Sequence, residues 1–258
     1  MSTPRIVCWF SDGAASAVAT KLAIDKYKVV EIYRTETGSE HPDGPRFRAE
    51  CEKWFGQSVK VLQSKKYPDT WSVFNHKQYL VDPQGGAPCT LELKRKPGRE
   101  VLTGGEIEIY GYTREEAHRV SQWQAINMDR TIECPLIERD LGKEDCLGII
   151  NRLGIALPVM YRLGFRNNNC IACVKARDNI DYWKRTRKHF PAQFSRMAAK
   201  ERELGFALNR RTVDGIRATV FLDEIEAGDP TGPDPKMSCG LFCMAEADAL
   251  AAPTTNPA

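Results

Sequence analysis

The sequence has no apolar run that approaches the roughly twenty residues needed to cross a bilayer. Its opening residues, MSTPRIVCWF, also lack the charged start and the longer apolar segment of a signal peptide. Both absences predict a cytoplasmic protein that has no membrane partner. The sequence gives no indication of an oligomeric state.

Positive charge is in only slight excess. The chain has 37 Lys and Arg residues and 34 Asp and Glu residues, which give a formal net charge of +3. Any site for an anion must therefore come from a local cluster of cations. The 9 cysteines are an odd number in a predicted cytoplasmic chain, which favours thiols, metal ligands or nucleophiles over disulfides. The 4 histidines show no spacing typical of metal ligands.

What the sequence does have is an alternation of strand and helix patterns along its first half. Apolar segments that predict strands lie at residues 5–10, 28–35, 58–63 and 106–112. Helical spacing follows at residues 14–26, 44–56 and 113–123, and Thr113 with Glu116 forms a capping-box signature. Strands that alternate with helices predict an α/β fold whose parallel sheet is covered on both faces.

The character of the sequence changes after about Ile137, where we place a domain boundary. Residues 1–137 are predicted to form a nucleotide-binding α/β domain, and residues 138–245 a mainly helical, Cys-rich region. The latter contains expected helices at residues 143–158 and 181–205. Residues 246–258, rich in Ala, Pro and Thr, are predicted to be a disordered tail.

The stretch Ser11-Asp-Gly-Ala-Ala-Ser16 connects the first predicted strand to the first predicted helix. Such a loop presents unpaired backbone N–H groups and the positive end of the helix dipole, which together bind anions. Gly13 and Ala14 leave room for a ligand, and the hydroxyls of Ser11 and Ser16 add donors. A tight turn with Ser16 as a helix cap explains the pattern equally well, and the carboxylate of Asp12 would repel a phosphate unless it points away or binds a metal.

A second motif, APCTLELKRKPGRE at residues 87–100, places Cys89 shortly before four cations. These cations are Lys94, Arg95, Lys96 and Arg99. Such a density of positive charge suits a phosphate or a sulfate group. A solvated helical face is the alternative interpretation.

The late cysteines form two pairs, Cys170 with Cys173 and Cys239 with Cys243. A Cys-x-x-Cys pair can place two thiolates on one metal or cluster, and a remote pair can complete the ligand set. The remaining cysteines on apolar faces or near strands are expected to pack in the core; they are Cys8, Cys51, Cys134 and Cys146.

Together these motifs resemble the phosphoadenosine phosphosulfate reductase family, in the PP-loop adenine nucleotide alpha-hydrolase superfamily, and more closely its reductase-like proteins of phages and bacteria. The resemblance covers roughly residues 5–243. It implies a doubly wound five-stranded parallel sheet of order 3-2-1-4-5, with the ligand at the carboxyl ends of the strands. Residues matching the family's nucleotide-binding elements are Ser11, Gly13, Ala14 and Ser16, then Thr37 and Gly38, and then Gly111 and Arg119.

The resemblance also implies a [4Fe–4S] cluster, with Cys89, Cys170, Cys173 and Cys243 as ligands. The chain departs from cluster-containing adenylylsulfate reductases, which have a Cys-Cys pair where this sequence has Cys89 followed by Thr90. Cys243 would supply the missing ligand, or the cluster would have three protein ligands and an open iron. Zinc is the alternative metal.

The first functional hypothesis is sulfonucleotide reductase-like chemistry on phosphoadenylylsulfate or adenylylsulfate. Cys239 resembles the family's nucleophile, which attacks the sulfate sulfur and expels the adenine nucleotide. Lys94, Arg95 and Lys96 would neutralise the developing charge, and a thiol reductant protein would be the partner.

Two further hypotheses remain open. In the first, ATP adenylates a nucleobase of tRNA or DNA and sulfur displaces AMP, and the aromatic and basic residues at 183–190 bind the nucleic acid; they are Trp183, Lys184, Arg185, Arg187, Lys188 and Phe190. In the second, the chain is a nucleotide-binding module without catalysis, stabilised by zinc at Cys170, Cys173, Cys239 and Cys243.

Overall fold

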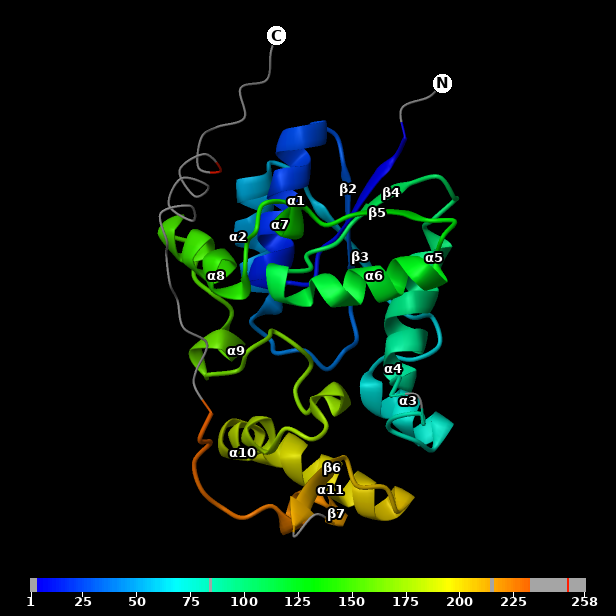
Figure 1. Cartoon of the computed structure of the whole chain (residues 1–258), viewed down its shortest axis with the longest axis vertical. Coiled ribbons are helices and arrows are strands. Elements are labelled where there is room, and N and C mark those ends of the chain that lie inside the picture. The colour runs from blue at the N-terminus through cyan, green and yellow to red at the C-terminus, as the bar shows by residue number, and fades with distance from the viewer. Residues whose placement is uncertain (1–3, 84, 214–215, 233–249, 251–258) are drawn as a thin grey trace.

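A five-stranded parallel sheet forms the centre of the protein in the computed structural model, which describes residues 4–83, 85–213, 216–232 and 250 (Figure 1). The strand order is β3-β2-β1-β4-β5, and every pairing is parallel. The strands are β1 (Ile6–Trp9), β2 (Glu31–Thr35), β3 (Val59–Leu62), β4 (Ile107–Ile109) and β5 (Thr131–Glu133). The expected doubly wound α/β fold and its strand order are confirmed. The order reverses between β1 and β4, and ligands of such sheets bind at the carboxyl ends beside this reversal.

Helices cover one face of the sheet with an apolar core. Figure 1 shows α1 (Ala14–Tyr27), α2 (Gly44–Phe55), α7 (Pro135–Glu138) and α8 (Lys143–Arg152) on this side. Alternate residues of the strands, such as Cys8 and Ile32, face these helices and are almost fully buried. The core continues past residue 137, the expected domain boundary, because α7 and α8 pack against α1.

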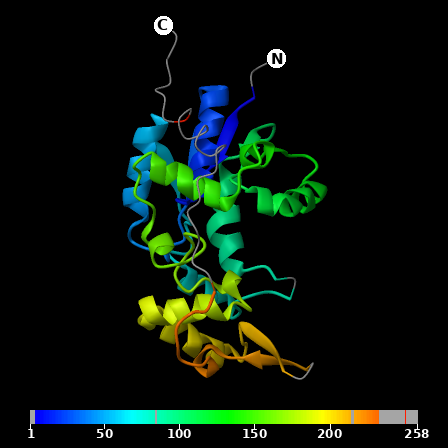
Figure 2. The same ribbon diagram turned by 60° about the vertical axis from the view of Figure 1, so that its left-hand side comes forward.

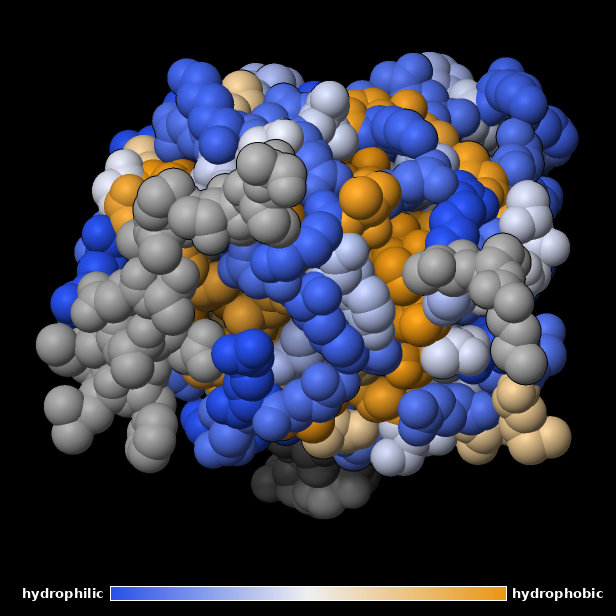
Figure 3. All heavy atoms as spheres, turned by 90° about the horizontal axis from the view of Figure 1, so that it is seen from above, coloured by the Kyte–Doolittle hydropathy of each residue, from blue (hydrophilic) through white to orange (hydrophobic). Residues whose placement is uncertain are grey.

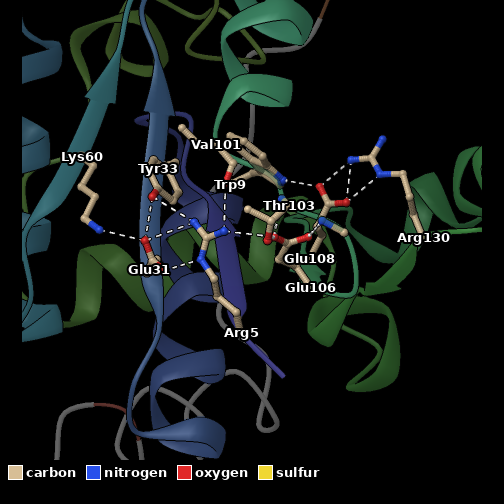
Figure 4. Close-up of polar contacts among 11 residues, drawn as sticks. Arg5, Trp9, Glu31, Tyr33, Lys60, Val101, Thr103, Glu106, Glu108 and Arg130 are labelled. Atoms are coloured by element: carbon tan, nitrogen blue, oxygen red, sulfur yellow. Dashed lines mark hydrogen bonds and ion pairs between the residues drawn. The ribbon is translucent and has the colours of Figure 1, made fainter. Parts of the chain in front are cut away.

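A row of charged side chains crosses the opposite face of the sheet in strand order (Figure 4). The pairs run from Lys60 to Glu31, from Glu31 to Arg5, from Arg5 to Glu106, and from Glu108 to Arg130. Glu106 and Glu108 are only 6% and 2% exposed, so their burial requires these charged partners. Because each pair joins residues that lie in, or directly before, neighbouring strands, the row favours the observed strand order. On this side Figure 1 shows α5 (Lys96–Glu100) and α6 (Ala117–Ile126).

The C-terminal part has a second core, beyond the end of the sheet toward which β1 runs (Figures 1 and 2). It consists of α10 (Ile180–His189), α11 (Pro191–Leu204) and the antiparallel hairpin of β6 (Asn209–Val213) and β7 (Ile216–Val220), with α3 (Thr70–Lys77) packed against them. The single helix expected over residues 181–205 is wrong, because the chain turns at Phe190 and Pro191 starts a new helix.

One more expectation about the second half needs correction. The helix expected at residues 143–158 ends at Arg152, since Gly154 has a positive φ of 72°, and a separate α9 (Val159–Arg162) follows. The prediction of a disordered tail at residues 246–258 stays a prediction, because within this range the structure describes Leu250 alone. Leu250 is 3% exposed in the first core, and its carbonyl accepts a hydrogen bond of 3.0 Å from the indole of Trp54.

The short elements complete the chain order. They are α4 (Pro88–Thr90), the π-helical η1 (Leu91–Arg95), and the 3-10 turns η2 (Arg114–Glu116), η3 (Val174–Ala176) and η4 (Leu222–Glu224). The capping box expected of Thr113 and Glu116 is confirmed at the start of η2.

The end of the molecule at which the strands begin mixes hydrophilic and hydrophobic residues on its surface (Figure 3). The most exposed large hydrophobic residues among those described are Val29, Ile126 and Met128, all on segments that lead into strands. None of the helices described is both long and apolar enough to span a membrane.

A buried carboxylate joins α11 to the C-terminal hairpin. Glu201 is fully buried, and its two oxygens accept hydrogen bonds from the backbone N–H groups of Leu208, at 2.5 Å, and Leu222, at 2.6 Å. Leu208 directly precedes β6 and Leu222 follows β7, so one side chain holds both ends of the hairpin.

We expect Glu201→Gln to lower the free energy of unfolding by about 1–3 kcal/mol, because the amide NH₂ would face one of the two N–H donors and leave it unsatisfied. Glu203→Gln on the same helix is the matched control. Glu203 is half exposed and pairs with Lys200, and such surface pairs contribute less than about 1 kcal/mol. Denaturant unfolding measures both variants, and equal losses would contradict the role assigned to Glu201.

Candidate functional site

The predicted anion-binding loop lies at the carboxyl end of β1, in the centre of the sheet. Ser16 Oγ accepts a hydrogen bond from the Ser11 N–H at 3.0 Å and donates to the Gly13 carbonyl at 2.9 Å. The hydroxyls of Ser11 and Ser16 are 3.0 Å apart. A Cβ atom at Gly13 would lie 3.2 Å from the Tyr161 hydroxyl and 3.6 Å from Ser11 Oγ. The loop is therefore a small cradle of hydroxyl groups around Gly13, and a side chain there would fill it.

The Asp12 side chain points away from this cradle, which removes the difficulty that its charge raised for anion binding. Asp12 is 1% exposed, has a positive φ of 53°, and its carboxylate lies 2.7 Å from the Arg34 guanidinium of β2. Its carbonyl oxygen accepts a hydrogen bond from the Asn168 side chain at 2.6 Å. Burial raises the pKa of the Asp12 carboxyl to about 6, although Arg34 and Arg48 oppose the shift.

This raised pKa makes stability depend on pH. The folded protein binds the Asp12 proton more tightly than the unfolded chain, whose carboxyl has the ordinary pKa of 3.8. The stabilisation is fully present below the unfolded pKa and is lost as the pH rises through about 6. We expect the unfolding free energy of the native protein, minus that of Asp12→Asn, to fall by about 1 kcal/mol from pH 5 to pH 8.

The comparison with Asp12→Asn at each pH removes the titration of all other groups. Denaturant unfolding of the two proteins at both pH values makes the measurement. A difference that does not change with pH would mean that Arg34 keeps the carboxyl at its ordinary pKa.

Gly111 and Gly38 follow the carboxyl ends of β4 and β2, and both occupy positions where a side chain would clash. A Cβ at Gly111 would lie 2.7 Å from Ser16 Cα, so the segment after β4 packs directly on the start of α1. A Cβ at Gly38 would lie 2.1 Å from the Pro68 carbonyl, and its φ is +65°. Glycine at these two positions allows the backbone to approach the loop closely on one side and the segment before α3 on the other.

The Cys-x-x-Cys turn is attached to the segment that follows β2. Thr37 Oγ1 lies 2.9 Å from Cys170 Sγ, and the N–H of Ile171 donates to the Ser39 carbonyl at 2.9 Å. Tyr182 closes the turn from the other side, since its hydroxyl accepts from the Cys173 N–H at 2.7 Å and donates to the Cys170 carbonyl at 3.3 Å. The turn therefore lies near the same edge of the sheet as the loop after β1.

Cys89 belongs to the same cluster. Burial raises the pKa of its thiol to about 11, and the charge of Cys173 adds to this effect while Lys175 and Lys94 oppose it. Burial likewise raises the pKa of Cys170 to about 12, again with Lys94 opposing. The structure thus brings three predicted metal ligands and two cations together from segments far apart in the sequence.

The predicted cations have different surroundings. Lys94 and Arg95 are exposed on η1, and neither forms an ion pair with the residues that the structure describes. Lys96, in contrast, pairs with Glu92 at 2.7 Å, and its expected role in neutralising the substrate stays a prediction. Arg119 pairs with Glu116 and lies over the ring of Tyr112 at 5.1 Å.

In the basic stretch at residues 183–190, several of the side chains that were predicted to bind nucleic acid contact the protein itself. Trp183 is fully buried, and its indole donates to the Ala176 carbonyl at 3.2 Å, so it cannot stack on a base. Arg187 donates to two backbone carbonyls of the segment after β7, and Lys188 pairs with Asp229 at 2.7 Å. The stretch holds the C-terminal part together.

The expected packing role of the remaining cysteines is confirmed, since none of the four is more than 7% exposed; they are Cys8, Cys51, Cys134 and Cys146. The predicted nucleophile Cys239 and the predicted ligand Cys243 lie outside the described residues. Over the described ranges, no group of three His, Cys, Asp or Glu side chains is arranged to hold a metal ion.

The structure adds residues that the sequence did not single out. Asn168 holds the loop after β1 through the Asp12 carbonyl, Tyr161 lies over Gly13, and Tyr182 fixes the Cys-x-x-Cys turn. Asn168 stands in the Asn-rich stretch before Cys170, whose polar character was the one available signal.

No protein-family model matches the chain, and no curated protein matches it either. The fold and the site geometry are therefore the basis for the function proposed below.

Proposed function

We propose that the protein is a sulfonucleotide reductase-like enzyme, which binds an adenine nucleotide at the loop after β1 and reduces its sulfate group next to the cysteine cluster. One observation carries the proposal: the contact of 2.9 Å between Thr37 and Cys170 attaches the cysteine turn to the edge of the sheet that carries the loop. A nucleotide whose phosphate lies on the loop would extend its reacting end toward Lys94, Cys89 and Cys170.

The proposed reaction starts from phosphoadenylylsulfate or adenylylsulfate. The thiolate of Cys239 attacks the sulfate sulfur, the bond from sulfur to the phosphate oxygen breaks, and the electron pair leaves with the adenine nucleotide. A thiol of a reductant protein then attacks the sulfur of Cys239, which releases sulfite and forms a disulfide. The sulfate sulfur gains two electrons and the two thiols lose them. Lys94 and Arg95 would stabilise the negative charge of the sulfate end during the attack.

We propose Cys89, Cys170, Cys173 and Cys243 as the ligands of a [4Fe–4S] cluster, although the described residues contain no preformed group of three metal ligands. In such a cluster each cysteine binds a different iron, so the thiols need only surround a shared space. Lys94 and Lys175 would supply positive charge beside the thiolates of a bound cluster. A bound cluster supplies one-electron redox chemistry. A cytoplasmic location follows as part of the proposal, because thiols and their reductants persist there.

Cys239→Ser is expected to abolish turnover and to leave the iron content unchanged, because the proposal makes Cys239 the nucleophile and not a ligand. Turnover is measured as sulfite released from adenylylsulfate, or its 3′-phosphorylated form, in the presence of a dithiol reductant. Loss of iron in the variant would make Cys239 a ligand instead.

The same assay separates the competing functions. Release of pyrophosphate from ATP that depends on added tRNA or DNA, without any sulfite from the sulfonucleotides, would replace the proposal by nucleobase modification. Nucleotide binding with zinc and without turnover would indicate a binding module.

A further inference from the structure

Two side chains from the helices after β5 lie over the loop at Gly13 and Ala14. Tyr161 of α9 is 7% exposed, and its hydroxyl lies 3.4 Å from the Ala14 N–H. Lys143, the first residue of α8, places its Nζ 3.3 Å from the same hydroxyl and 5.1 Å from the centre of the Tyr161 ring. Both residues are thus held at the start of α1, where its dipole attracts anions.

The hydroxyl of Tyr161 has one hydrogen-bonding function left over. It accepts a hydrogen bond from the Ala14 N–H and another from Lys143, so both lone pairs of its oxygen are used. Within the described part of the chain no acceptor lies against its own proton. A buried O–H donor without an acceptor is costly, unless a ligand supplies the acceptor.

Lys143 has a charge that the described residues do not neutralise. Its polar contacts there are the Tyr161 hydroxyl and the side-chain oxygen of Asn167, at 3.0 Å, and neither carries a negative charge. The nearest acidic residue of the loop, Asp12, turns inward to Arg34. The mouth of the cradle therefore has a cation and a free O–H donor, together with the helix N-terminus.

We propose that Lys143 and Tyr161 form the phosphate subsite of the nucleotide site, in which Lys143 Nζ and the Tyr161 O–H bind the 5′-phosphate held on the Ser11–Ser16 loop. This proposal rests on the proposed function for the identity of the ligand as an adenine nucleotide. It separates two anion sites. The loop, Lys143 and Tyr161 hold the phosphate, and Lys94 with Arg95 remains for the sulfate end.

Calorimetric titration with AMP, adenosine and inorganic phosphate tests the proposal in the full-length protein. Lys143→Gln removes a charged donor, so we expect it to lower the AMP affinity at least about tenfold. Tyr161→Phe removes a neutral donor, so we expect a loss of about fivefold. Adenosine affinity should be unchanged in both variants. Lys143→Gln should also weaken the dependence of AMP binding on salt.

The chain provides a matched control pair at the other end of α1. Lys26 lies over the ring of Tyr27 at 4.7 Å, the same arrangement as Lys143 over Tyr161, but it pairs with Glu133. Lys26→Gln and Tyr27→Phe are expected to bind AMP as the native protein does.

The outcomes separate this proposal from the proposed function. If the native protein binds AMP and both site variants bind it equally well, Lys143 and Tyr161 are structural and the phosphate subsite is wrong. If the native protein binds phosphate but no adenine nucleotide, and Lys143→Gln loses phosphate, the subsite is supported and the proposed function fails. Binding of neither ligand would overturn both.

Discussion

Gly13→Val is expected to lower the affinity for adenine nucleotides by at least about a hundredfold. A Cβ at Gly13 would already lie 3.2 Å from the Tyr161 hydroxyl, and the two methyl groups of valine would fill the space between the hydroxyls. A phosphate would then lose two or more charge-assisted hydrogen bonds, each contributing about 1.5–3 kcal/mol. Calorimetric titration with AMP and ATP measures the effect.

The backbone at Gly13 makes this substitution a test of binding more than of folding. Its φ of −114° and ψ of 154° are extended, and a valine adopts them without strain. Gly13→Ala serves as the graded control, because a single methyl group narrows the cradle without closing it, and we expect a smaller loss. Thermal unfolding checks that both variants fold. Full nucleotide affinity in a folded Gly13→Val would mean that the loop is only a tight turn.

The second large effect is expected for Cys170→Ser, which should lose the iron and the brown colour of the anaerobically reconstituted protein. Serine preserves the volume of the side chain and its contact with Thr37, but its hydroxyl is a poor ligand for iron. Metal and sulfide analysis with the visible spectrum gives the result.

Cys134→Ser is the matched control for this prediction. Cys134 is 7% exposed at the start of α7 and is not one of the predicted ligands, so its replacement should retain the colour. Colourless native protein that contains zinc would contradict the cluster and support the zinc alternative. Equal iron content in the native protein and Cys170→Ser would remove Cys170 from the ligand set.

The parts of the fold that the sequence predicts are those written in local patterns. The apolar run before the loop and the small residues after it define β1 and α1, and Gly56 ends α2 with the left-handed backbone expected at such a stop. The hairpin of β6 and β7 is not among the predicted elements, although the sequence contains a signal for it. Alternating residues flank Asp214-Gly215, a pair typical of tight hairpins.

The orientation of the site residues depends on distant partners, which local patterns do not contain. The Asp12 side chain turns inward because its carboxylate pairs with the guanidinium of Arg34 in β2. The Asp12 carbonyl accepts a hydrogen bond from the side chain of Asn168, 156 residues further along the chain. The Cys-x-x-Cys turn reaches this edge of the sheet because Thr37 and Ser39, which precede α2, contact Cys170 and Ile171, which follow α9.

The function of aromatic and basic residues at helical spacing also depends on packing that the local sequence does not show. The stretch with Trp183 and Arg187 has the composition of a nucleic-acid surface, yet the same spacing suits a helix that buries its tryptophan and ties the next segment with its arginines. Only the packing of α11 and the hairpin against α10 decides between the two.

The central claim is that the loop after β1 and the cysteine cluster form one site, and a spectroscopic titration tests it most directly. Adenylylsulfate is added to the anaerobically reconstituted protein while the electron paramagnetic resonance spectrum of the reduced cluster is recorded. The account predicts that the spectrum changes with the same midpoint as calorimetric binding, and that Gly13→Val moves both midpoints upward together. Calorimetric binding with no change in the spectrum would contradict a shared site.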